Sequence, residues 1–113
     1  VQRLAGGDGA GGAAADVAAV PGRFIKAVEL CDADLAMRGT ITEDTMRHRR
    51  LCGEGQFDLS GFVAALGQAG YDGPFGVEIL SDALRALPLD EAARRSFDTA
   101  APFCAIAAGA AGQ

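Results

Sequence analysis

The chain has 113 residues, about the length of one domain, and half of them are apolar, so a modest core can form. Fifteen acidic residues against ten basic ones give a net charge of −5, which argues against a nucleic-acid partner. No apolar run is long enough to cross a bilayer, so no membrane partner is expected. The three cysteines are widely spaced and form no CxxC pair, which favours reduced thiols in a cytoplasmic protein.

The first half of the chain predicts a helix and then a strand. Residues 1–12 are Gly-rich and are expected to be flexible. A short helix is predicted over residues 13–20, because Pro21-Gly22 then stops it. Residues 24–31 are apolar and bounded by turn residues, which indicates a strand. A long loop over residues 32–56 follows, and it carries Arg38, Arg47, His48, Arg49 and Arg50.

The second half repeats this alternation. Asp58 is the predicted N-cap of a helix that Gly70 closes, with apolar residues at helical spacing. A turn leads to a strand over residues 75–80, and Ser81 or Asp82 is expected to cap a short turn. A final helix is predicted from about residue 89 to 102, before a frayed tail over residues 107–113. Such alternation implies parallel strands, although two strands do not make an independent parallel sheet.

One carboxylate, that of Glu78, stands inside the second predicted strand, near its C-terminal end. A buried charge is costly unless it is paired or holds a metal. Ligands in α/β proteins bind at the C-terminal ends of parallel strands. Glu78 is therefore the first functional candidate. A Glu paired with a buried Arg is the alternative, and residue chemistry alone leaves the two about equal.

Three motifs follow one another at a specific spacing: Gly53-Glu54-Gly55, Gly70-Tyr71-Asp72-Gly73-Pro74 and Gly76-Val77-Glu78. Together they resemble the C-terminal part of the sugar phosphate isomerase/epimerase family, whose members are xylose isomerase-like TIM barrels. The resemblance covers residues 3–103 and implies an α/β fold, a partial (β/α)8 barrel that contains only the last βα units. A whole barrel takes about 250 residues. Residues 1–113 would then be a C-terminal fragment, with earlier ligands upstream.

The resemblance also implies a divalent metal at the mouth of the barrel. Glu78 matches the last-strand Glu that binds the metal and moves a proton. Glu29 stands where many members carry His, and Asp32 follows it. Ligands that are all oxygen suit manganese, magnesium or cobalt better than zinc.

Substrate contacts are implied at three further positions. Arg50 resembles the Arg that precedes the family's glycine-glutamate-glycine loop, and Glu54 belongs to that loop. Arg3, followed by a glycine pair, resembles a segment after the sixth strand. Cys52 stands where the family usually has Pro, which would loosen the loop.

The activity implied by the resemblance is that of a metal-dependent isomerase or epimerase, which moves a proton next to the carbonyl of a small sugar or sugar phosphate. Two alternatives stay open. One is a metal-dependent lyase or hydrolase on the same barrel, such as a dehydratase. The other is a non-catalytic fragment that self-associates as a homo-oligomer through exposed strand edges.

Overall fold

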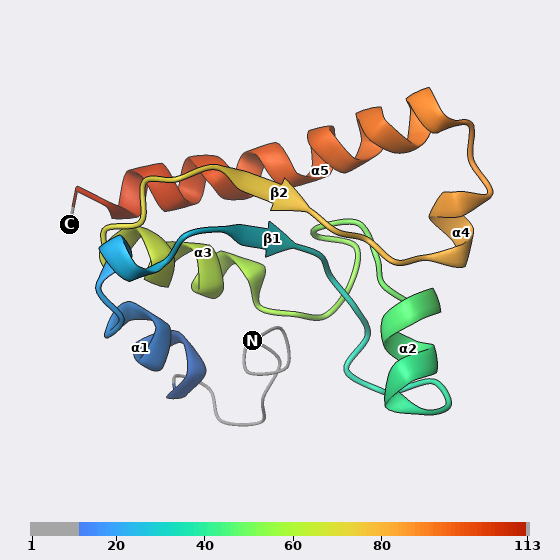
Figure 1. Cartoon of the computed structure of the whole chain (residues 1–113), viewed down its shortest axis with the longest axis horizontal. Helices are drawn as coiled ribbons and strands as arrows, with labels where there is room; N and C mark the ends of the chain where they lie inside the picture. The colour runs from blue at the N-terminus through green and yellow to red at the C-terminus, as the bar shows by residue number, and fades with distance from the viewer. Residues whose placement is uncertain (1–11, 113) are drawn as a thin grey trace.

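The computed structural model describes residues 12–112, which form helices around one pair of strands (Figure 1). The predicted flexible start, including Arg3, lies almost wholly outside the described residues. Among those that are described, no helix is long and apolar enough to cross a membrane. The elements in chain order are α1 (Gly12–Ala18), the 3-10 helix η1 (Gly22–Phe24), β1 (Val28–Leu30), α2 (Ile41–Arg47), α3 (Leu59–Gln68), β2 (Phe75–Val77), α4 (Asp82–Arg85) and α5 (Leu89–Ala110).

The strands β1 and β2 pair in parallel, which confirms the parallel arrangement predicted from the alternation of helix and strand. Val28 lies opposite Phe75, and Leu30 opposite Val77. The N–H of Glu78 donates to the carbonyl of Leu30 at 3.1 Å and so extends the pairing by one bond. Both strands are shorter than predicted. The first begins late because η1 occupies its expected start, where the N–H of Ile25 donates to the Gly22 carbonyl at 3.0 Å.

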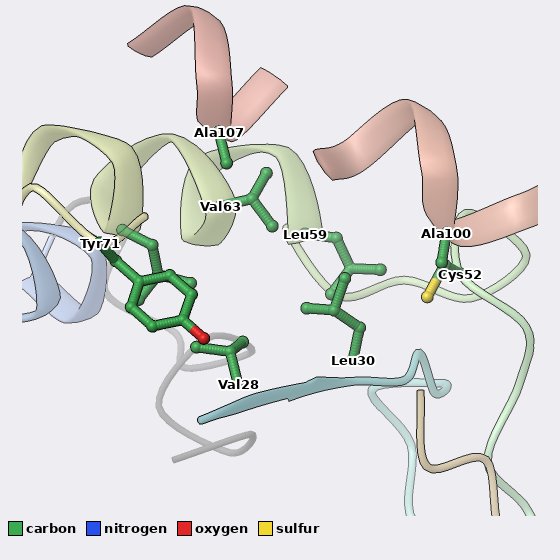
Figure 2. Packing of buried hydrophobic residues seen from close by; sticks show 9 residues of the cluster. Val28, Leu30, Cys52, Leu59, Val63, Tyr71, Ala100 and Ala107 are labelled. Carbon is green, nitrogen blue, oxygen red and sulfur yellow. The ribbon is translucent and has the colours of Figure 1, made fainter. Parts of the chain in front are cut away.

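Helices α3 and α5 cover one face of this sheet. Val28 and Leu30 point from β1 toward Leu59 and Val63 of α3 (Figure 2). Leu66 and Tyr71 extend the same cluster, and Ala100 and Ala107 join it from α5. The small side chains of α5 let it approach α3 closely: a Cβ on Gly67 would clash with the carbonyl of Ala107. The helical spacing from Leu59 to Leu66 therefore marks the face of α3 that is buried, as predicted.

Helix α5 continues well past Pro102, so the predicted end of this helix was wrong. Proline removes one backbone hydrogen bond and usually kinks a helix. Here the following turns are held by packing, because Ala107 and Ala110 are both buried and lie against Gly67 of α3. The tail that was expected to fray is thus helical as far as Ala110.

Helix α2 lies within the segment that was predicted to be a loop, which is a second correction. It begins with a capping box: the Thr40 hydroxyl accepts from the Glu43 N–H at 3.2 Å, and the Glu43 carboxylate accepts from the Thr40 N–H at 2.8 Å. Two orphan donors at the helix start are satisfied in this way. Both α2 and α4 lie beyond the carboxyl ends of the two strands (Figure 1).

Candidate functional site

The face of the sheet opposite α3 carries two carboxylates side by side. Side chains alternate along a strand, so Glu29 points away from the core that its neighbours Val28 and Leu30 enter. Gly76 lies opposite Glu29, and a Cβ placed there would be 3.7 Å from Glu29 Cγ. Glu78, two residues further along, is on the same face. The structure thus brings two of the predicted metal ligands together at the carboxyl end of the strands.

The proximity of Glu78 changes the acidity of Glu29. A hydrogen bond with Glu78 raises the pKa of the Glu29 carboxyl, and the negative charge of Glu78 raises it further. Two like charges at one site resist simultaneous ionisation, so the pair retains a proton more readily than an isolated carboxylate. A divalent cation would replace that proton and neutralise both groups. The pair therefore fits a metal as two oxygen ligands.

Asp32, the third predicted ligand, holds a loop instead of joining this pair. It is 1% exposed, and its Oδ1 accepts the N–H of Ala33 at 2.8 Å and of Phe57 at 2.9 Å. Its Oδ2 accepts the N–H of Gly53 at 3.0 Å. Asp32 thus fastens both ends of the Gly53–Phe57 loop. A Cβ on Gly55 would clash with Asp32 Oδ1, so the loop needs glycine there.

Arg50 forms a two-pronged ion pair with Asp34. Its Nε lies 2.9 Å from Asp34 Oδ1, and its Nη2 donates to Asp34 Oδ2 at 2.9 Å. The backbones of Arg50 and Asp32 also pair as an antiparallel bridge. The guanidinium predicted to contact substrate is therefore fixed in place by a neighbouring carboxylate. The Arg50 side chain remains 41% exposed.

Arg49, the neighbour of Arg50, is the arginine that is buried. It is 6% exposed, and its guanidinium stacks over the Phe57 ring at 5.7 Å. Its Nη2 donates to the Thr45 hydroxyl at 3.2 Å, while its Nε has no hydrogen-bond partner among the described residues. No role for Arg49 is predicted from the sequence. Its burial follows from the extended backbone of residues 48–50, where His48 and Arg50 form bridges and Arg49 points the other way.

Of the two remaining predicted site residues, Glu54 is the one that lies within the part of the chain that the structure describes. Glu54 is exposed on the loop that Asp32 holds, and its N–H donates to the Leu51 carbonyl at 3.0 Å. Arg3 lies outside the described residues. Among residues 12–112, no group of three or more His, Cys, Asp or Glu side chains is arranged to hold a metal ion. The described residues therefore bring together two carboxylates, which are fewer groups than a protein metal site uses.

The three cysteines are free thiols, and Cys31 and Cys52 are buried. Burial is the main cause that raises the pKa of both thiols, to about 11 for Cys52. Such thiols stay protonated near neutral pH and act as apolar packing groups. Cys52 belongs to the core beside Leu59 and Ala100.

The structure defines an α/β unit with two parallel strands and a pair of carboxylates at their carboxyl ends. Comparison with known proteins finds two curated relatives over most of this unit. A 3-dehydroshikimate dehydratase of Pseudomonas aeruginosa is 38% identical over 72 residues, which are 64% of this chain and 11% of that protein. A 3-dehydroshikimate dehydratase of Pseudomonas putida is 39% identical over 70 residues, 61% of this chain and 11% of that protein.

The chain thus matches only about a tenth of the length of these relatives. No family model matches it, and no solved structure does either. The homology is confined to a partial region, and it agrees with the xylose isomerase-like superfamily that the motifs resemble.

Proposed function

We propose that this chain is the C-terminal portion of a xylose isomerase-like barrel that acts as a metal-dependent dehydratase on a small hydroxylated keto acid. The observation that carries the proposal is the Glu29–Glu78 pair, which lies on the open face at the carboxyl ends of two parallel strands. Its support from outside the structure is the likeness to two 3-dehydroshikimate dehydratases. The dehydratase, one of the two alternatives left open by the sequence, is thereby preferred to an isomerase or epimerase.

Glu29 and Glu78 would supply two of the oxygen ligands, and the others would come from outside residues 12–112. Bound manganese, magnesium or cobalt would polarise the substrate carbonyl and so acidify the neighbouring C–H. Glu78, which is exposed on this face, would then accept that proton as a general base, and the hydroxyl group on the next carbon would leave with a proton as water. In this proposal Asp32 keeps the Gly53–Phe57 loop in place, and the roles of Arg50 and Glu54 as substrate contacts rest on the family resemblance alone.

Titration with manganese tests the metal part of this proposal. We expect weak, saturable binding to the chain that Glu78→Gln and Glu29→Gln each reduce by about tenfold or more, since each removes a charged ligand. Asp98→Asn removes an exposed carboxylate of α5 and is the matched control, expected to bind like the unchanged chain. Equal binding by all four proteins would contradict the assignment of the pair as a metal site.

An isomerase or epimerase remains the second candidate, because both reactions begin with removal of a proton next to a carbonyl. The two differ in product mass. A dehydratase releases one water, whereas an isomerase leaves the mass of its substrate unchanged. Mass spectrometry after incubation of 3-dehydroshikimate with manganese and a barrel that contains this chain would separate them.

A further inference from the structure

A pocket of about 290 Å³ lies between the segment that follows α2 and the start of α4. Most of its lining is basic: Arg38, Arg47, His48, Arg49 and Arg50. Ser81 and Asp82 close it from the α4 side. Arg85 of α4 ties the two sides together, because its Nη1 donates to the carbonyl of Met46 on α2 at 3.0 Å. Four of the ten Lys and Arg residues therefore line one pocket of a chain whose net charge is −5.

The carboxylates near this pocket already have partners. Asp34 pairs with Arg50, and Asp82 pairs with Arg85 at 3.1 Å. Asp44 accepts the backbone N–H of Arg38 at 3.0 Å. Glu43 is held in the capping box of α2, where its pKa is lowered chiefly by hydrogen bonds from Thr40 and also by Arg47 and His48. These groups reduce the positive potential of the rim without reaching Arg49.

Arg49 is the buried basic group of this pocket, whereas Arg47, which also has no ion pair among the described residues, is exposed to solvent. Among the described residues, no carboxylate lies within 4.0 Å of the Arg49 guanidinium nitrogens, and its Nε is buried without a partner. A buried guanidinium is costly unless an anion or other acceptors satisfy it. The planar fork of arginine matches a carboxylate or a phosphate, which can accept two parallel N–H bonds.

We propose that this pocket binds the anionic group, a carboxylate or a phosphate, of a small molecule, with Arg49 as its central contact. A volume of 290 Å³ suits one small ligand or the acidic end of a larger one. The inference that the bound anion is the acid group of the substrate rests on the proposed function. The inference that the pocket binds an anion at all depends only on Arg49 and the arginine-lined cavity.

Titration of the metal-free chain with benzoate and with inorganic phosphate tests the proposal and distinguishes the two sources of negative charge. The Nε–H signal of Arg49 in a nitrogen-proton NMR spectrum reports binding at the proposed contact, and its loss in Arg49→Lys assigns the signal. Arg47→Gln removes a guanidinium from the exposed rim, so it tests the pocket even where Arg49 variants fold poorly. Arg94→Gln removes an exposed arginine of α5 and is the matched control.

We expect one anion to shift the Arg49 signal in a saturable way, and Arg47→Gln to weaken that binding by about threefold or more, through the loss of one nearby charge. Arg49→Lys, in which binding is followed by the backbone amide signals of residues 48–50, should weaken it by about tenfold or more, because lysine cannot form the paired bonds. Arg94→Gln should bind like the unchanged chain. An Arg49 signal that moves with neither anion, or equal weakening in Arg47→Gln and Arg94→Gln, would overturn the proposal.

The metal titration separates this inference from the proposed function. Anion binding that survives in Glu29→Gln and Glu78→Gln, together with a failure to bind manganese, would leave the pocket standing and remove the metal-dependent dehydratase. Manganese binding without a response of Arg49 to either anion would support the metal site and remove the anion pocket.

Discussion

The two faces of the β1–β2 sheet differ in what covers them. The face of Val28 and Leu30 packs against α3 and α5, and both of these side chains are buried, whereas Val77 of β2 on the same face is 40% exposed. The face of Glu29, Gly76 and Glu78 is exposed and carries two carboxylates whose charges oppose one another. The covered face stabilises the fold with groups of this chain alone. On the open face, the two carboxylates repel one another when both are charged, so this face does not stabilise the fold as the core does.

Truncation of the covered face is expected to have the largest effect. Leu30→Ala removes a side chain that is 1% exposed and leaves a cavity against Leu59 and Val63, so it should lower the free energy of unfolding by about 3 kcal/mol. Urea denaturation monitored by circular dichroism measures this change. Leu89→Ala, at a side chain that is 86% exposed, is the control and should change stability by less than about 0.5 kcal/mol. Similar losses in both variants would show that the covered face is not the core.

A smaller but still large effect is expected at Asp32, which lies at the border between the two faces. Asp32→Ala leaves the N–H groups of Ala33, Gly53 and Phe57 without their acceptor, so it should cost about 2 kcal/mol of stability. Asp34→Ala removes an ion pair that is half exposed at its Arg50 end and should cost about 0.5 kcal/mol.

The manganese affinity of the folded Asp32→Ala protein distinguishes the two roles of this carboxylate. A residue that only holds the Gly53–Phe57 loop leaves metal binding at Glu29 and Glu78 in place. A loss of metal binding as large as that in Glu78→Gln would return Asp32 to the set of ligands that the family resemblance implied.

The sequence was sufficient where one local rule decides the structure. The helical spacing from Leu59 to Leu66 predicted the buried face of α3, and the alternation of helix and strand predicted the parallel pairing of β1 and β2. The capping box of Thr40 and Glu43 was a local signal as well, but it was overlooked because the surrounding residues are polar and suggested a loop.

The remaining features depend on contacts that no local pattern contains. Proline ends most helices, and the packing of Ala107 against α3 explains why α5 continues past Pro102. Asp32 has the chemistry of a metal ligand, yet its carboxylate accepts two backbone N–H groups from a loop more than twenty residues away and a third from its neighbour Ala33. The distinction between Arg49 and Arg50 rests on which way each side chain points from an extended segment, and a shift of one residue reverses it.

The smallest expected effect concerns the pKa of the Glu29 carboxyl, which lies on the open face. The pKa of its carboxyl is raised by Glu78, so the folded chain holds a proton there at pH values where the unfolded chain has lost it. Stability from this group is therefore present below pH 4.5, the ordinary value, and is lost as the pH rises through the raised pKa of the folded state.

Glu78→Gln removes the negative charge that causes this shift and should return the pKa of Glu29 toward its ordinary value. Carbon NMR of the side-chain carboxyl groups measures both titrations. Glu91→Gln, at a carboxylate that pairs with Arg95 on α5 at 2.7 Å, is the control and should leave Glu29 unchanged. If Glu29 titrates alike in all three proteins, the two carboxylates do not interact. The open face would then hold two independent charges, and the proposal that they bind a metal together would rest on the sequence alone.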